Sequence, residues 1–185
     1  MDIAIVILAA GKGTRMKSDL PKVMHPLAGW PMVRYVWQAA QALDPRAVAV
    51  VVGHGADLVR EALGPAVPYV TQAEQLGTGH AVRQAEAATA GRARTVLVLY
   101  GDTPLIRPET LRRLVAHHRA EQAAVTVLSF YPADPTGYGR ILRDAEGRML
   151  AVIEEKVATP EQRAIGEANG GVLCVRDAWL WPNLA

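Results

Sequence analysis

Short apolar runs alternate with longer segments of helical period along most of the chain. The apolar runs, rich in Val, Ile and Leu, predict strands at 3–8, 47–52, 67–71, 95–100, 124–130, 149–154 and 171–175. The segments between them predict helices at 31–43, 56–63, 79–90, 108–120 and 160–167. This alternation is typical of βαβ units, in which helices cover both faces of a mostly parallel sheet. We therefore expect an α/β fold.

Two segments add detail to this picture. The helix at 108–120 has an apolar face at positions i, i+3, i+4 and i+7, which we expect to pack on the sheet; it consists of Leu111, Leu114, Val115 and His118. Pro108 suits the first turn of that helix. The stretch 139–155 instead predicts two strands around an Ala-Glu-Gly turn, a small antiparallel departure from the parallel pattern.

Composition limits the function classes. With 185 residues, half of them hydrophobic, the chain is long enough for one domain with a core. Its 20 basic and 18 acidic residues form no long Lys/Arg block, so we expect no nucleic-acid partner. Cys174 is the only cysteine, which excludes an intramolecular disulfide and a thiolate metal cluster and favours a cytoplasmic protein. The apolar start of the chain is too short for a membrane span and lacks the basic region of a signal peptide.

A basic, glycine-containing loop follows the first predicted strand. Residues 8–22 read LAAGKGTRMKSDLPK. The dinucleotide fingerprint G-x-G-x-x-G fails here because Met16 replaces its third glycine, and no P-loop sequence occurs. Glycines at the carboxyl end of a parallel strand nevertheless let backbone N–H groups approach an anion. The compensating charge is available from Lys12, Arg15, Lys17 and Lys22. We therefore expect a polyphosphate to bind this loop, although a merely solvated basic loop is the alternative.

Polar groups also follow two later strands. Asp102 comes after Tyr100 and Gly101 at the end of strand 95–100, where a carboxylate can hold Mg²⁺ beside phosphate oxygens. The alternative is that Asp102 is a turn or capping residue for the next helix. Gln72 carries an amide donor and an acceptor, which match the imide edge of a pyrimidine base. Thr78 begins the next predicted helix, where it can act as a cap, contact a ligand, or both.

Several polar positions have weaker signals. Gly139 could bring the backbone close to a ligand, and Glu154 and Asn169 could hydrogen-bond hydroxyl groups. Each also has an ordinary explanation, as a turn glycine, a solvated carboxylate or a loop asparagine. The five histidines show no metal-ligand grouping.

Four segments together resemble a known family. The segment LAAGKGTRMKSDLPKVMHPLAG resembles the signature of the sugar-nucleotide pyrophosphorylases. QAEQLGTGHA, YGDTPLI and DPTGYGRI are similar to the N-acetylglucosamine-1-phosphate uridylyltransferase branch of that family. The resemblance runs in order from about residue 3 to residue 169 and implies a Rossmann-like fold, with Mg²⁺, UTP and N-acetylglucosamine-1-phosphate as ligands.

The resemblance also implies roles for individual residues. The uridine would be held by Leu8, Ala9, Ala10, Gly11, Gln72, Gly77 and Thr78, with Tyr100 and Gly101 also lining the substrate site. Arg15 and Lys22 would bind the phosphates as the catalytic residues, and Asp102 would bind Mg²⁺. The amino sugar would contact Gly139, Glu154 and Asn169.

The chain departs from the family beyond residue 169. Residues 1–185 correspond to a nucleotidyltransferase domain that is shorter at its C-terminal end than in the family, and a second metal-binding asparagine is not reached. The acetyltransferase β-helix domain on which the family's trimer depends is absent from the sequence, so we expect a monomer or a weak oligomer. Two alternatives stay open: a pyrophosphorylase with another nucleotide or sugar specificity, and a nucleotide-binding fragment without turnover.

Overall fold

The computed structural model describes residues 1–13 and 16–184. The chain divides into two compact units. The first unit comprises residues 1–126 and 173–185, and the second comprises residues 127–172. Arg15, predicted to bind phosphate, lies outside the described residues. Among the described residues, no helix combines the length and the apolar character needed to cross a membrane.

The first unit is built on a mostly parallel sheet. Its strands are β1 (Ile3–Ala9), β4 (Ala47–Val52), β5 (Tyr69–Thr71) and β6 (Thr95–Tyr100), in the order β5-β4-β1-β6. Val6 on β1 is the register partner of Ala49 on one side and of Val98 on the other. The last residues of β10 (Ala168–Arg176) extend the sheet antiparallel to β6. This arrangement confirms the predicted α/β fold.

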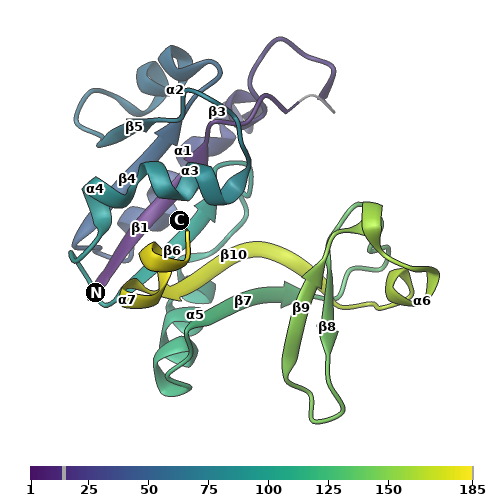
Figure 1. Ribbon diagram of the computed structural model, residues 1–185. Helices are drawn as coiled ribbons and strands as arrows, with labels where there is room; N and C mark the ends of the chain where they lie inside the picture. The colour runs from purple at the N-terminus through teal and green to yellow at the C-terminus, as the bar shows by residue number, and fades with distance from the viewer. Residues whose placement is uncertain (14–15, 185) are drawn as a thin grey trace. The chain divides into compact units, whose positions relative to one another are not determined.

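Helices cover both faces of this sheet. Adjacent residues of a strand point to opposite faces, and Ile3 through Ile7 of β1 are all fully buried, so neither face is open to solvent. The covering helices are α1 (Met32–Gln41), α2 (Ala56–Leu63), α3 (Thr78–Gln84), α4 (Glu86–Thr89), α5 (Pro108–Ala120) and α7 (Asp177–Leu180). Figure 1 shows α3 and α4 crossing in front of β1.

The predicted apolar face of the helix at 108–120 is confirmed. All four of its residues on α5 are buried: Leu111, Leu114, Val115 and His118. The ring of His118 is satisfied by Thr126, whose Oγ1 lies 2.9 Å from Nδ1. Burial lowers the pKa of His118, and the neighbouring charges of Arg176 and Arg119 lower it further. His118 is therefore a neutral core residue that occupies an apolar position.

The second unit contains the predicted antiparallel departure. Strands β8 (Arg140–Arg143) and β9 (Met149–Ile153) form a hairpin, with Ile141 opposite Val152. The first part of β10 adds to this hairpin, since Ala168 pairs with Arg140. The unit also contains a 3₁₀ turn, η3 (Glu155–Val157), and the short helix α6 (Pro160–Arg163). Strands β7 (Val125–Phe130) and β10 belong partly to each unit.

Three predicted helices have different bounds in the structure. The helix expected at 31–43 is α1, which is shorter at both ends. The helix expected at 160–167 ends at Arg163, because Glu167 joins the hairpin, where its carbonyl accepts a hydrogen bond from the Ile141 amide at 3.0 Å. The helix expected at 79–90 is divided at Ala85 into α3 and α4. The short elements that were not predicted include η3 and also η2 (Lys22–Met24), β2 (Pro26–Leu27), β3 (Trp30–Pro31) and η4 (Trp181–Asn183).

Candidate functional site

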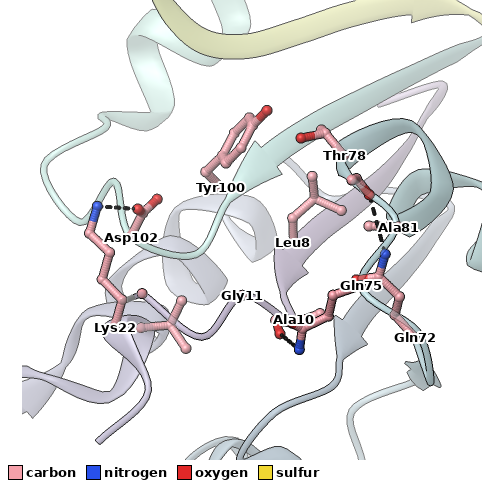
Figure 2. A pocket seen from close by; sticks show the side chains of 13 residues that line it. Leu8, Ala10, Gly11, Lys22, Gln72, Gln75, Thr78, Ala81, Tyr100 and Asp102 are labelled. Carbon is pink, nitrogen blue, oxygen red and sulfur yellow. Dashed lines mark hydrogen bonds and ion pairs between the residues drawn. The ribbon is translucent and has the colours of Figure 1, made fainter. Parts of the chain in front are cut away.

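A pocket of about 330 Å³ opens at the carboxyl ends of the parallel strands in the first unit. The chain builds the sheet outward from β1 through β4 to β5 and then returns to place β6 on the other side of β1. Ligands of open α/β sheets bind at such a reversal of strand order, because the loops there diverge and leave a crevice. Figure 2 shows side chains from these loops around the pocket. It is lined by Leu8, Ala10, Gly11, Gly13, Lys22, Val23, Gln72, Gln75, Gly77, Thr78, Ala81, Tyr100 and Asp102.

The backbone after β1 is held by hydrogen bonds from neighbouring loops. The carbonyl of Ala10 accepts from the His54 amide at 3.3 Å and from Gln75 Nε2 at 3.0 Å. Gly13 has a φ of +64°, and a Cβ added there would lie 2.5 Å from the Cβ of Lys22. Glycine is therefore required at Gly13 for both conformation and space, and it lets the loop lie against Lys22.

The charged side of the pocket is a close ion pair. Lys22, on η2, places Nζ 2.7 Å from Oδ2 of Asp102, which follows β6. The Asp102 side chain is 25% exposed and that of Lys22 is 44% exposed, so both can reach a ligand in the pocket. The dashed line between these two side chains in Figure 2 marks this contact. A residue predicted for phosphate and one predicted for metal thus lie beside each other.

The opposite side of the pocket is polar and uncharged. Gln72, immediately after β5, is only 4% exposed. Its amide nitrogen lies 3.2 Å from the carbonyl oxygen of Gly77 and 3.0 Å from Nδ1 of His80. Thr78 is the first residue of α3 and also lines the pocket. This side can offer hydrogen bonds to an uncharged planar group such as a base.

Most of the sequence-predicted residues of the first unit line this one pocket. These are Leu8, Ala10, Gly11, Lys22, Gln72, Gly77, Thr78, Tyr100 and Asp102. Ala9 is buried, and neither Ala9 nor Gly101 lines the pocket. The backbone amide of Gly101 donates to the Leu8 carbonyl at 2.9 Å. A Cβ on Gly101 would approach that carbonyl to 3.1 Å, so glycine lets the ends of β1 and β6 come together.

Four lining residues were missed by the sequence reasoning: Gly13, Val23, Gln75 and Ala81. Gly13 and Gln75 stand inside segments that the sequence already marked, the basic loop and QAEQLGTGHA. Val23 and Ala81 are apolar and carry no signal that separates them from core residues. Their role depends on the pocket shape, which a sequence pattern does not report.

The three residues predicted to contact the sugar are gathered in the second unit. The backbone amide of Asn169 donates a hydrogen bond to the backbone carbonyl of Gly139 at 2.8 Å. A Cβ on Gly139 would lie 3.3 Å from Oε1 of Glu154, which places that carboxylate directly against the glycine. Oδ1 of Asn169 accepts from the Gly171 amide at 2.9 Å, which fixes the side-chain direction. The structure therefore brings Gly139, Glu154 and Asn169 together from three separate strands and loops.

The donor set at Asp102 fits a metal only when a ligand supplies further oxygens. Within the described part of the chain, no group of three or more His, Cys, Asp or Glu side chains could hold a metal ion. Mg²⁺ requires about six oxygen ligands and is commonly held by one or two carboxylates together with phosphates and waters. Asp102 and a bound triphosphate match that pattern, and Lys22 provides a second positive charge beside them.

A family model described as MobA-like NTP transferase domain matches residues 5–165. The protein named "Bifunctional protein GlmU" of Geobacter metallireducens is 53% identical to this chain over 182 residues, and that of Azotobacter vinelandii is 54% identical over 181 residues. Both matches cover 97% of this chain, but only 38% and 39% of the relatives. The chain thus spans about two fifths of the length of the curated relatives that it matches.

Solved structures share the fold at lower identity. A UDP-glucose pyrophosphorylase complexed with UDP-glucose has a TM-score of 0.76 at 21% identity and covers 97% of this chain and 78% of its own. A CMP:2-keto-3-deoxy-manno-octonic acid synthetase complexed with CTP has a TM-score of 0.72 at 21% identity, covering 98% of this chain and 76% of its own. These similarities establish the nucleotide-sugar transferase type of fold.

Proposed function

Since the chain belongs to the family of MobA-like NTP transferase domains, we propose that it transfers UMP from UTP to N-acetylglucosamine-1-phosphate and releases pyrophosphate. The observation that carries this proposal is the division of the pocket into an uncharged side around Gln72 and a charged side at Lys22 and Asp102. A nucleoside triphosphate has the same division, between a base and a chain of phosphates. Relatives about 50% identical over nearly the whole chain are named as GlmU proteins, which together with the family model supports nucleotidyl transfer. The substrate pair is the one that the resemblance of the four sequence segments implies.

The phosphate side of the proposed site works by charge. Phosphates that enter the pocket compete with Asp102 for the ammonium group of Lys22, 2.7 Å away. Lys22 then binds a phosphate oxygen, and Arg15, which lies outside the described residues, is proposed to act with it. Mg²⁺ bound by Asp102 would neutralise charge on the phosphate oxygens. The chain's own contribution is therefore to position and neutralise the triphosphate before reaction.

The proposed reaction needs no general base. A phosphate oxygen of the sugar-1-phosphate attacks the α-phosphorus of UTP in line, the new P–O bond forms, and the bond to pyrophosphate breaks. The attacking phosphate is mostly dianionic near neutral pH, because the second pKa of a phosphate monoester is about 6. The lining residues accordingly include a lysine and a carboxylate but no Ser/His pair. Positioning and electrostatics supply most of the rate in such phosphoryl chemistry.

We propose that the second unit contributes the amino-sugar contacts. Gly139, Glu154 and Asn169 are neighbours there and offer a carboxylate, an amide and backbone groups. A carboxylate accepts hydrogen bonds from sugar hydroxyls, and an amide can both donate and accept. Glycine at 139 lets the backbone lie close to Glu154, because a Cβ there would lie 3.1 Å from Cγ1 of Val152 and 3.3 Å from Oε1 of Glu154.

The test is pyrophosphate release by the purified chain from UTP and N-acetylglucosamine-1-phosphate, with and without Mg²⁺. We expect release that requires Mg²⁺ and falls about 100-fold or more in Asp102→Asn, as when one preorganised electrostatic contact is lost. Asp57→Asn is the matched control, because Asp57 is an exposed carboxylate on α2 that does not line the pocket. Equal loss in both variants, or activity independent of Mg²⁺, would contradict the proposal.

The same experiment separates the two alternatives. A panel of UTP, CTP, GTP and dTTP identifies a pyrophosphorylase with another specificity by the nucleotide that gives the highest kcat/KM. A panel of sugar-1-phosphates identifies the preferred sugar substrate in the same way, by the highest kcat/KM. Binding of UTP without pyrophosphate release would favour a nucleotide-binding fragment.

A further inference from the structure

Arginines gather at the amino edge of the parallel sheet, at the other end of the strands from the pocket of Lys22 and Asp102. Two adjoining hollows of about 600 and 620 Å³ open there, and both belong to the first unit. Among the described residues, the arginines that line one or both hollows are Arg46, Arg92, Arg94, Arg119 and Arg176. We refer to the two hollows and these five residues as the arginine edge.

The sheet topology explains why these arginines meet. Arg46 and Arg94 immediately precede β4 and β6, the two parallel neighbours of β1, so both enter the sheet at the same edge. Arg176 ends β10, which runs antiparallel to β6 and therefore finishes where β6 begins. Arg119, in the last turn of α5, donates to the backbone carbonyl of Asp2 at 2.7 Å. Like charges thus converge from four different elements.

The positive charges at the arginine edge outnumber the negative ones. Within the described part of the chain, the carboxylates that line it are Asp2 and Asp177. Asp177 is engaged elsewhere, since its Oδ1 accepts from Nε1 of Trp181 at 2.7 Å. Asp2 places Oδ1 3.0 Å from Nε of Arg46 and Oδ2 3.7 Å from Nε of Arg94. One carboxylate therefore serves several guanidinium groups, and a net positive charge remains.

The buried ring of His118 senses this charge. His118 is 3% exposed and lines the hollow of about 600 Å³. Burial is the main reason that its pKa is lowered, and the charges of Arg176 and Arg119 lower it further. The positive field thus reaches the wall of the hollow, where it would attract an anion.

The lining favours a compact phosphate ion over an acidic protein segment or a nucleic acid. The planar guanidinium group of arginine can hold two oxygens of one phosphate at once. The apolar side chains in the lining are small ones, which give a peptide no anchor: Ala93, Ala123 and Ala178. Among the described residues, no Trp, Tyr or Phe lines either hollow, so bases have no ring on which to stack. Affinity at this edge must come from charge.

We propose that the arginine edge binds a small polyphosphate anion, recognised through its phosphate groups alone. The anion competes with Asp2 for the guanidinium groups of Arg46 and Arg94. This site is separate from the nucleotide pocket, because Thr95 at the start of β6 lines one and Tyr100 at its end lines the other. Five residue steps along a strand span about 17 Å, too far for three linked phosphates to occupy both sites.

The experiment is a calorimetric titration of the purified chain with tripolyphosphate at low ionic strength, where surface charges are least screened. Arg94→Gln removes a guanidinium group that is 92% exposed, so the fold does not depend on it. We expect binding about 10-fold weaker in Arg94→Gln, as for one lost hydrogen bond to a charged group. Arg148→Gln is the control, because it removes the same charge from an exposed arginine of the second unit, and it should bind like the wild type.

Two further variants of the experiment sharpen the result. Asp2→Asn should bind tripolyphosphate about 2- to 5-fold more tightly, because it removes the carboxylate that competes for Arg46 and Arg94. ATP has the same three linked phosphates together with a base. It should bind at the arginine edge no more tightly than tripolyphosphate does, as judged by the concentration that half-shifts the NMR signals of the His118 ring.

The pKa of His118 separates this site from the pocket at Lys22. A bound polyphosphate neutralises Arg176 and Arg119, so the pKa of His118, followed by proton NMR of its ring, should rise toward its ordinary value. An ion that binds only beside Lys22 should leave that pKa unchanged. An unchanged pKa of His118 at saturating tripolyphosphate, equal affinities of Arg94→Gln and Arg148→Gln, or tighter binding of ATP at the edge would overturn the proposal.

Discussion

A buried carboxylate in the second unit gives the sharpest stability prediction. Glu167 is 5% exposed and accepts hydrogen bonds from Nε and Nη2 of Arg143, both at 2.7 Å, and from Oγ of Ser129 at 2.6 Å. The hydrogen bonds from Arg143, helped by that from Ser129, lower the pKa of Glu167 to about 2, against its burial, which acts to raise it. The substitution Glu167→Gln removes the charge, keeps the shape, and leaves Arg143 without its carboxylate.

The expected destabilisation by Glu167→Gln follows from the lowered pKa of the Glu167 carboxyl group. A drop from 4.5 to about 2 corresponds to about 3 kcal/mol of stabilisation by the ionised carboxylate, at about 1.4 kcal/mol per pKa unit. Because the pKa is lower in the folded state, this stabilisation is fully present above pH 4.5 and is lost as the pH falls toward 2. We expect Glu167→Gln to be less stable than the wild type by about 3 kcal/mol at pH 7, with a difference that shrinks below pH 4.5.

The assay is hydrogen exchange at the Ile141 amide, which donates to the carbonyl of Glu167 and reports local opening of the second unit. Exchange rates at pH 7 and pH 3.5, each divided by the intrinsic rate, give the opening free energy. Glu146→Gln is the control, because Glu146 is 66% exposed and pairs with Arg148 at 3.3 Å, an ion pair worth less than about 1 kcal/mol. Equal effects of the two substitutions at pH 7 would refute the reasoning.

Three other predictions concern the first unit. Burial raises the pKa of the Cys174 thiol to about 12, so we expect a disulfide reagent at pH 8 to label it only after urea is added. Gly55→Ala should destabilise the unit by about 1–3 kcal/mol in urea unfolding followed by tryptophan fluorescence, because its Cβ would lie 2.2 Å from Cγ of Pro21. Gly91→Ala should cost less, since φ is similar there and nothing lies within 4 Å. Arg15→Ala should lower turnover about 100-fold or more, and Arg15→Lys should restore it only partly, because lysine lacks the fork that holds two phosphate oxygens.

The fold was predictable because its signals are local. β4 and β6 have the predicted bounds, since each of these apolar runs lies between an arginine and a glycine and is largely buried. The convergence of Gln72 and Asp102 on one pocket was also within reach of the sequence. Both follow parallel strands, and the carboxyl ends of such strands share one edge of the sheet.

The end of α6 and the contact of Lys22 with Asp102 were not predicted, because each depends on residues that are far apart along the chain. The helix expected at 160–167 fails after Arg163 because Glu167 is bound by Arg143 and Ser129, 24 and 38 residues away. The contact of Lys22 with Asp102 joins two loops, and nothing in the sequence singles out Lys22 among the four cations of the first loop. A periodic pattern reports how a segment buries its own faces, and it contains no information on such pairs.

The base side of the pocket shows the same limit at short range. The sequence indicates that residue 72 is an amide able to donate and to accept, and it leaves both uses open. The structure places the amide nitrogen of Gln72 3.2 Å from the carbonyl oxygen of Gly77 and 3.0 Å from Nδ1 of His80. Partners five and eight residues along the chain therefore determine how this side chain is presented to the pocket, and the residue type alone does not report them.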